Sequence, residues 1–214
     1  MAQETEIKLI LPPSDLDTIA GLPFIKTAEK TGEYELLNRY FDTPDLALTH
    51  YKIALRIRQA GQYFIQTLKT QGVSSQGLHQ RKEWEWPLSE DALDPSRLYE
   101  AEWPTGLSIN DLGSRLEKIF STDFNRTVWM VKHPSGEIEV ALDVGRVSVE
   151  GPDGELLTDP ICELELELKK GDVGWLLSVA DEMRKAMPAL EPSDISKAQR
   201  GYQLYEQAKK HHTL

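Results

Sequence analysis

The segment Cys162-Glu-Leu-Glu-Leu-Glu-Leu168 determines the fold, because apolar and acidic side chains alternate along it without interruption. Successive side chains of a β-strand point to opposite faces, so the leucines share one face and the three glutamates share the other. This segment therefore predicts a strand with one apolar face and one fully ionised face.

Similar alternation recurs along the chain and predicts eight strands, over residues 3–11, 34–42, 52–59, 62–71, 78–88, 123–132, 137–150 and 155–169, with a break allowed near Gly145. Residues 151–154 predict a hairpin turn between the last two strands. Apolar residues at helical spacing, or capping signals, predict helices over residues 13–20, 44–51, 108–120 and 172–187 and from about residue 196. We therefore expect a mainly β, α+β protein, with an antiparallel sheet closed into a barrel and helices packed on the outside.

Composition narrows the class of protein. The chain has 214 residues, 24 Lys and Arg, 35 Asp and Glu, and a formal net charge of −11, which argues against nonspecific binding to nucleic acid. No stretch approaches the roughly 18 apolar residues of a membrane span, and no signal peptide is recognisable. A single cysteine, Cys162, excludes an intramolecular disulfide. We expect one cytoplasmic domain over residues 1–214 that binds neither nucleic acid nor membrane, and we leave open whether it is a monomer or a homodimer.

The charges on the polar strand faces cluster by sign. Glu4, Glu6 and Lys8 share one face, Arg56 and Arg58 share another, and the three glutamates of the first segment share a third. Alternation of this kind is also typical of an ordinary sheet whose charged face is exposed. However, exposed strands usually mix in Ser, Thr, Asn and Gln, and carboxylates spaced roughly 7 Å apart along a strand repel one another unless cations compensate them.

Carboxylate oxygens suit Mg²⁺ or Mn²⁺, whereas arginines bind phosphate oxygens. A carboxylate site for a metal ion and a cationic site for phosphate, on one charged face, together predict a metal-bound polyphosphate ligand. A barrel that turns its charged face inward would accommodate both.

These residues resemble the CYTH domain, or triphosphate tunnel metalloenzyme, family. The family motif Glu-x-Glu-x-Lys stands at Glu4–Lys8. It is followed in order by ALRIR, QTLK, HQRKEWE, FNR, ALD, CELELE and SKAQRGY, which extend the resemblance to about residue 205. The local strings look like the bacterial inorganic triphosphatase branch. Members of that branch often carry a C-terminal CHAD domain, which we expect to be absent from this chain.

The resemblance implies an eight-stranded antiparallel barrel whose tunnel binds inorganic tripolyphosphate and hydrolyses it to phosphate and pyrophosphate with Mg²⁺ or Mn²⁺. It implies metal ligands at Glu4, Glu6, Asp143, Glu163 and Glu165, with Glu167 in an outer position. It implies phosphate contacts from Lys8, Arg56, Arg58, Lys69, Arg81, Arg126 and Lys197. The expected catalytic residues are Glu4, Glu6, Lys8, Arg58 and Glu83, with Glu83 and Glu85 orienting the arginines or water.

Three other functions remain open at this point: a thiamine triphosphatase, a class IV adenylate cyclase, and a non-catalytic module that binds polyphosphate or a nucleotide. A thiamine ring would need an aromatic platform at the tunnel mouth. Alternation instead places Trp84 and Trp86 on the apolar face, so we expect them to lie in a hydrophobic core.

Overall fold

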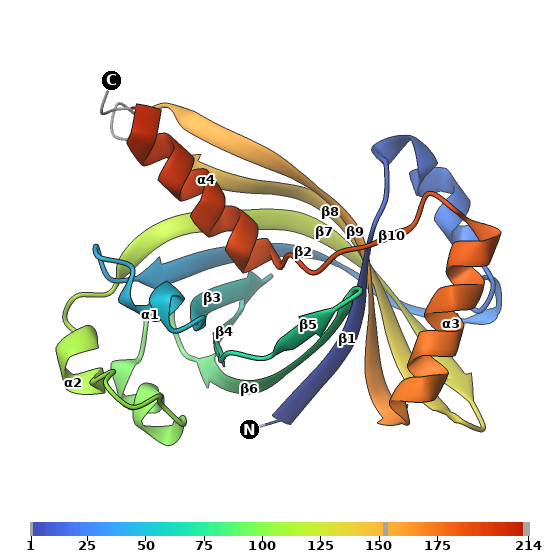
Figure 1. Cartoon of the computed structure of the whole chain (residues 1–214), viewed down its shortest axis with the longest axis horizontal. Helices are drawn as coiled ribbons and strands as arrows, with labels where there is room; N and C mark the ends of the chain where they lie inside the picture. Colours follow the sequence, from blue (N-terminus) through green and yellow to red (C-terminus); the bar gives the residue numbers. More distant parts are fainter. Residues whose placement is uncertain (1, 152–153, 212–214) are drawn as a thin grey trace.

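The computed structural model describes residues 2–151 and 154–211, and in this part of the chain ten strands form one antiparallel sheet (Figure 1). The first strand pairs with the sixth on one side and with the ninth on the other, which closes an eight-stranded barrel. Two short strands lie outside the closed circuit. The strands are β1 (Ala2–Ile10), β2 (Glu29–Asp42), β3 (Ala54–Ala60), β4 (Tyr63–Lys69), β5 (Val73–Ser75), β6 (Leu78–Leu88), β7 (Glu117–His133), β8 (Gly136–Glu150), β9 (Leu156–Gly171) and β10 (Glu191–Pro192).

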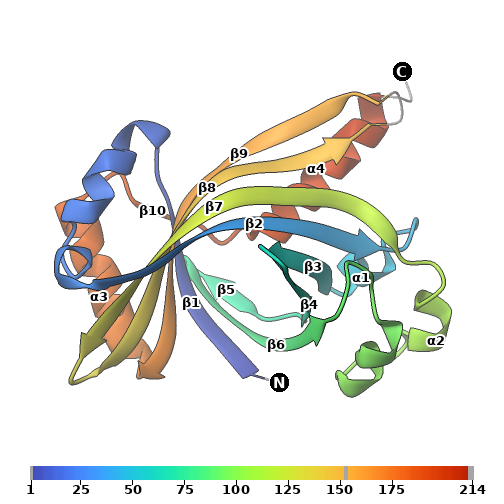
Figure 2. The same ribbon diagram turned by 180° about the vertical axis from the view of Figure 1, so that it is seen from behind.

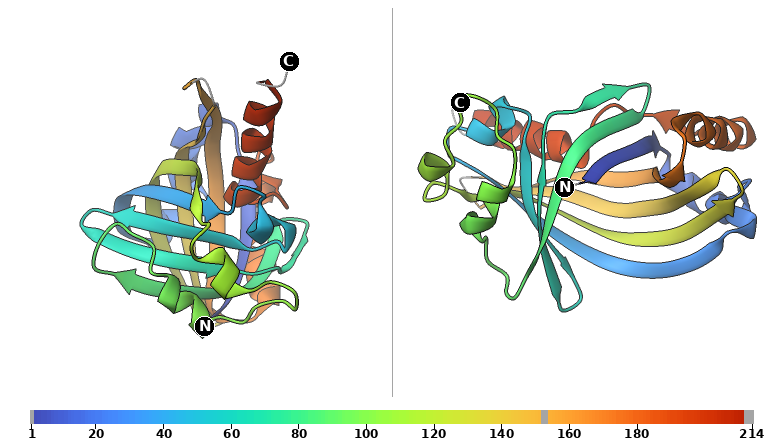
Figure 3. Two further views of the ribbon diagram at one scale, coloured as in Figure 1. Left: turned by 90° about the vertical axis from the view of Figure 1, so that its left-hand side faces the viewer. Right: turned by 90° about the horizontal axis from the view of Figure 1, so that it is seen from below.

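Helices are few, and the two long ones lie on separate parts of the barrel (Figures 1 and 3). The α-helices are α1 (Ala47–His50), α2 (Ile109–Leu112), α3 (Val173–Ala186) and α4 (Lys197–His211), and the 3₁₀ helices are η1 (Pro13–Gly21), η2 (Ile25–Thr27) and η3 (Pro95–Glu100). None of the helices in the described ranges is long and apolar enough to cross a lipid bilayer.

The predicted fold class is confirmed, and the eight predicted strands correspond to the eight strands of the barrel. Figure 2 shows β9, β8, β7 and β2 running side by side as one long curved layer. β8 continues without a break through Gly145, where a side chain would lie 2.1 Å from the carbonyl oxygen of Asp123. β8 and β9 form the predicted hairpin, although Pro152 and Asp153 of its turn lie outside the described residues.

The predicted helix over residues 108–120 is wrong. Only α2 is helical there, and β7 already begins at Glu117. Ile109, Leu112, Leu116 and Ile119 have helical spacing. However, Ile119 and Phe120 are buried in one cluster at a β-bulge of β7 opposite Tyr40 and Phe41. Pairing with β2 and β8 outweighs that local preference. β5 and β10 were not predicted, because strands of three and two residues are too short to show alternation.

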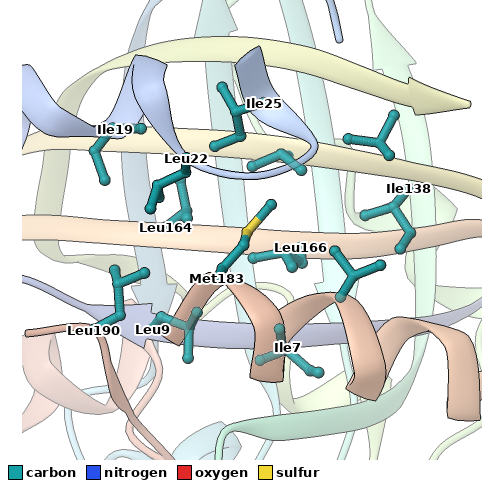
Figure 4. Packing of buried hydrophobic residues seen from close by; sticks show 14 of the residues in the cluster. Ile7, Leu9, Ile19, Leu22, Ile25, Ile138, Leu164, Leu166, Met183 and Leu190 are labelled. Carbon is teal, nitrogen blue, oxygen red and sulfur yellow. The ribbon is translucent and has the colours of Figure 1, made fainter. Parts of the chain in front are cut away.

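The outward faces of the strands carry two hydrophobic clusters, as the apolar alternation predicts. In the first, α3, η1 and η2 cover Leu9, Ile138, Leu164 and Leu166 (Figure 4). α3 begins after Asp172, whose side chain accepts a hydrogen bond from the Trp175 amide at 3.0 Å.

The second cluster lies under the segment between β6 and β7. It contains Trp84 and Trp86 with Leu55 and Leu68, so the prediction that both tryptophans are core residues is confirmed.

A third hydrophobic cluster lies on the inward face, at one end of the barrel under α4. Val147 and Ile161 lie on the same inward strand face as Asp143 and Glu163, but they are apolar and pack in this cluster. On this end of β8 and β9 the outward face is the exposed one, as Arg146 shows. The apolar side chains of β8 and β9 thus change from the outward to the inward face along the strands, and α4 covers one end of the interior.

A reciprocal pair of hydrogen bonds fixes the start of α4. The Ser196 hydroxyl accepts from the Gln199 amide at 3.2 Å, and the Gln199 side chain accepts from the Ser196 amide at 2.8 Å. This capping box sets the first turn of the helix, and Lys197 is its first residue.

The contact between α4 and the interior gives a test of the fold. A methyl group at Gly201 would lie 2.1–2.4 Å from ring atoms of the buried Phe120. In an ordinary helix, Gly→Ala stabilises by roughly 1 kcal/mol. We expect Gly201→Ala instead to lower the free energy of unfolding by roughly 1–3 kcal/mol, because it overpacks the cluster. Urea denaturation measures this change, with Gly21→Ala as the control because its added methyl meets open space. A stabilised Gly201→Ala protein would show that α4 does not pack on Phe120.

Candidate functional site

The barrel encloses a cavity of about 300 Å³ that is lined mainly by charged side chains. Most of these side chains are the inward-facing, alternate residues of β1, β3, β4, β6, β7 and β9, and Lys197 of α4 is added to them. The cavity wall includes nearly all of the residues predicted from the sequence: Glu4, Glu6, Lys8, Arg56, Arg58, Lys69, Arg81, Glu83, Glu85, Arg126, Glu165, Glu167 and Lys197. Asp143 and Glu163 lie behind this wall in contact with Lys197, so the structure brings every predicted residue to one region.

Three carboxylates form the acidic centre of the site. One oxygen each from Asp143, Glu163 and Glu165 lies within 4.8 Å of the others. Asp143 and Glu163 are buried, and the side chain of Glu165 is 12% exposed. Because β8 and β9 pair Asp143 directly with Glu163, the register of these two strands creates the cluster.

Two lysines from opposite ends of the chain neutralise the acidic centre. The Lys8 ammonium lies 2.6 Å from Glu163 and 2.5 Å from Glu165. The Lys197 ammonium lies 2.6 Å from Asp143 and 2.9 Å from Glu165, and it also contacts Glu163. Burial alone would lower the pKa of Lys8, but Glu163 and Glu165 raise it well above its usual range.

Arg126 completes the neutralisation from β7. Its guanidinium donates two hydrogen bonds of 2.7 Å to Asp143 and one of 2.5 Å to Glu165. Burial alone would raise the pKa of Glu165, yet Lys197, Lys8 and Arg126 together hold it well below its usual range. Glu165 is therefore ionised at neutral pH.

A second acidic pair lies on β1. Glu4 contacts Lys69 at 2.6 Å and Arg81 at 2.7 Å, and these cations outweigh burial and lower the pKa of Glu4. Glu6 contacts Arg81 at 3.2 Å, but burial and the nearby charges of Glu165 and Glu4 raise the pKa of Glu6. Two carboxylates two residues apart thus have pKa values shifted in opposite directions.

Two of the predicted glutamates differ in their surroundings. Glu83 lies 3.2 Å from Lys69, so its contact is with a lysine rather than with one of the arginines. Glu167 lies apart from the acidic centre, is partly exposed, and pairs with Lys169 at 2.8 Å. Its side chain is more exposed than those of the other predicted metal ligands.

Arg56 and Arg58 differ from the other cations of the cavity. In the described parts of the chain, neither makes an ion pair with a carboxylate within 4.0 Å. The Nε of Arg58 donates to the side-chain oxygen of Asn38 at 2.9 Å. Burial, together with the positive charges of Arg56 and Arg126, lowers the pKa of Arg58 to about 9. Positive charge is therefore in local excess here, which suits an anion.

Four uncharged residues of this region were not predicted as site residues. Tyr40 and Thr67 line the cavity with Ser196, and Asn38 is fully buried beside Arg58. Tyr40 stacks on Phe120, with ring centroids 4.5 Å apart. Sorting the strand over residues 34–42 by alternation would have placed Asn38 and Tyr40 on one face. Neither residue is an Asp, Glu, Lys or Arg, so the pattern of charged residues did not reveal them.

The donor set of the acidic centre fits a hard divalent cation. All candidate ligands are carboxylate oxygens, which Mg²⁺ and Mn²⁺ prefer. One oxygen of Glu163, Oε2, is buried with no hydrogen-bond partner among the described residues. A buried acceptor without a partner is costly, and a metal ion would satisfy it.

Known proteins resemble this chain in sequence and in fold. The sequence model of the CYTH domain matches residues 2–202. The chain is 37% identical over 212 residues to an inorganic triphosphatase from Haemophilus influenzae, covering 95% of this chain and 55% of that protein. The chain therefore spans about half the length of this curated relative.

Solved structures share the fold. A protein from Hippeastrum, described as an adenylyl cyclase candidate with a dominant triphosphatase activity, superposes with a TM-score of 0.68 at 18% identity, covering 95% of each chain. An adenylate cyclase candidate from Bacillus halodurans gives a TM-score of 0.57 at 22% identity, covering 94% of this chain and 98% of that one.

The opposite pKa shifts on β1 and β9 give a test of the site. The raised pKa of Glu6 means that its contribution to stability is present below about pH 4.5 and is lost as the pH rises through the folded value. The lowered pKa of Glu165 means that its contribution is present above about pH 4.5 and is lost as the pH falls through the folded value. At pH 7 without metal, we expect Glu6→Gln to keep or raise the melting temperature and Glu165→Gln to lower it.

Thermal melts of both variants at pH 7 measure this difference. The two substitutions are matched, since each removes one negative charge and keeps the shape of the side chain. Equal melting temperatures for the two variants would contradict the assignment of both carboxylates to the cavity.

Proposed function

The chain belongs to the CYTH domain family, and on this basis we propose that it is a metal-dependent hydrolase that splits inorganic tripolyphosphate into phosphate and pyrophosphate inside the barrel. The observation that carries the proposal is a single cavity that joins a carboxylate centre to a wall of cations. A bare carboxylate site would repel tripolyphosphate, and a purely cationic one would hold no metal. The combination suits a polyphosphate that carries a divalent cation.

The cations would bind the phosphate oxygens. Arg56 and Arg58 offer charge that no carboxylate of the described chain neutralises at close range, so they are the strongest candidates for substrate contact. Lys8, Lys69, Arg81, Arg126 and Lys197 line the same cavity and would exchange part of their carboxylate contacts for phosphate contacts. Arginine can do so with two parallel hydrogen bonds.

Glu4, Glu6, Asp143, Glu163 and Glu165 would hold Mg²⁺ or Mn²⁺, with Glu167 in an outer position. When bound, such an ion neutralises phosphate charge and polarises the phosphorus–oxygen bonds. Lys8 and Arg58 would stabilise the charge on the transferred phosphoryl group and its leaving group. Glu83 would hold Lys69 in place through the contact at 3.2 Å.

Inorganic tripolyphosphate fits this site better than thiamine triphosphate does. Trp84 and Trp86 pack in a hydrophobic cluster on the outside of the barrel, where they cannot stack on a ring bound in the cavity. Charged groups dominate the cavity wall, so recognition there depends on phosphate oxygens.

A substrate panel tests the proposal. We expect phosphate release from tripolyphosphate to exceed release from ATP, thiamine triphosphate and pyrophosphate by at least about tenfold, because the cavity binds through phosphate charge. Steady-state phosphate release is measured with Mg²⁺ or Mn²⁺. Equal or faster turnover of ATP would refute the substrate assignment, and binding without turnover would identify a polyphosphate-binding module instead.

Metal removal is a separate test. Because all proposed ligands are carboxylates, we expect excess EDTA to abolish turnover and Mg²⁺ or Mn²⁺ to restore it. The melting temperature should rise when metal and tripolyphosphate are added together, since both bind the folded state. Full activity in excess EDTA would remove the metal from the mechanism.

Arg58 gives the sharpest single-residue test of substrate binding. We expect Arg58→Ala to raise the KM for tripolyphosphate and lower kcat/KM by about 100-fold, while its melting temperature stays within a few degrees of wild type. Arg146→Ala is the matched control, because Arg146 is exposed on the outward face of β8. Unchanged kinetics in a folded Arg58→Ala protein would remove Arg58 from the site.

A further inference from the structure

We infer that Asn38 is a positioning residue that orients Arg58 toward the substrate while leaving its charge unneutralised. The inference rests on the proposed function and adds to it a residue that does not itself touch the substrate.

Asn38 lies directly across from Arg58 on the β2–β3 pair and directly across from Thr122 on the β2–β7 pair. Its side chain has no exposed surface. The Nδ2 group donates to the Thr122 carbonyl oxygen at 2.8 Å, and Oδ1 accepts from the Nε of Arg58 at 2.9 Å. A carbonyl can only accept a hydrogen bond, so the Thr122 contact fixes which end of the amide faces Arg58.

The partner of Arg58 is chemically different from the partners of five other cavity cations. Lys8, Lys69, Arg81, Arg126 and Lys197 each contact at least one carboxylate. Arg58 has a neutral amide in that position. The positive charges of Arg56 and Arg126 repel it, and Tyr40 and Asp143 offset this repulsion only in part. The amide supplies an acceptor that orients the guanidinium without cancelling its charge.

The hydrogen bond to Asn38 also determines which nitrogens of the Arg58 guanidinium stay available to a ligand. Nε is engaged by Asn38, and within the described residues no hydrogen bond engages the two terminal nitrogens. Arg58 lines the cavity, so these terminal groups remain for phosphate oxygens. A carboxylate at position 38 would compete with the phosphate for the same charge.

The test compares Asn38→Asp with Asn38→Ala by calorimetric titration of tripolyphosphate in the presence of EDTA. Aspartate keeps an acceptor for Arg58 but adds a negative charge, whereas alanine removes the acceptor and adds none. We expect Asn38→Asp to weaken binding by about tenfold or more and Asn38→Ala by only about threefold. A merely structural role predicts the reverse order, because aspartate preserves the hydrogen bond to Arg58. Asn125→Asp, on the exposed face of β7, controls for the change in net charge and should bind like wild type.

A double-mutant cycle tests whether Asn38 acts through Arg58, and it does not require Asn38→Asp to fold. If Asn38 acts through Arg58, Asn38→Ala should change the KM little in an Arg58→Ala background, although it raises the KM in the wild-type background. Additive effects on KM would overturn the inference. Wild-type protein that neither binds nor hydrolyses tripolyphosphate would overturn the proposed function and this inference with it. Wild-type binding with the reverse order of variants would overturn this inference alone.

Discussion

Confining like charges inside one barrel is the constraint on which the rest of this structure depends. The carboxylate oxygens of Asp143, Glu163 and Glu165 lie within 4.8 Å of one another in an interior with little access to water. Lys8, Lys197 and Arg126 lie among them and compensate their negative charge. Buried ion pairs of this kind contribute little net stability, because removing each charge from water is costly. The arrangement is better explained by the binding of a charged ligand than by the stability of the fold.

An interior filled with charge forces the hydrophobic core outward. The apolar faces of the strands need cover, and α3 supplies it on one side while the segment between β6 and β7 supplies it on another. α4 is the exception, since it packs on inward-facing Phe120, Val147 and Ile161. That placement brings its first residue, Lys197, into the acidic centre. On β8 and β9, the charged site and the hydrophobic cluster under α4 are therefore built from successive inward-facing residues of the same strands.

The sequence predicted the barrel strands and the inward set of charges, because both follow from alternation with a period of two. It did not predict the change of buried face along β8, although Val147 stands at an odd position after the even-numbered Ile138 and Val140. It also did not predict Asn38, whose role depends on pairing with two strands at once. Individual contacts, such as Arg126 with Asp143, depend on strand register and side-chain rotamers, and alternation specifies neither.

Closure of the barrel by β1 has a consequence for the time course of folding. Lys8 and its partner Glu165 are 157 residues apart, so β1 must wait for β9, which is synthesised much later. Contacts between such distant residues form slowly, on the order of milliseconds to seconds. During that interval the edge of β1 lacks a neighbour, and a bare strand edge invites pairing with other chains. Glu6 and Lys8 lie on the part of β1 that later pairs with β9. Charged side chains on a strand edge disfavour pairing with other chains, so residues proposed to bind metal and phosphate also fit the general pattern of a protected edge.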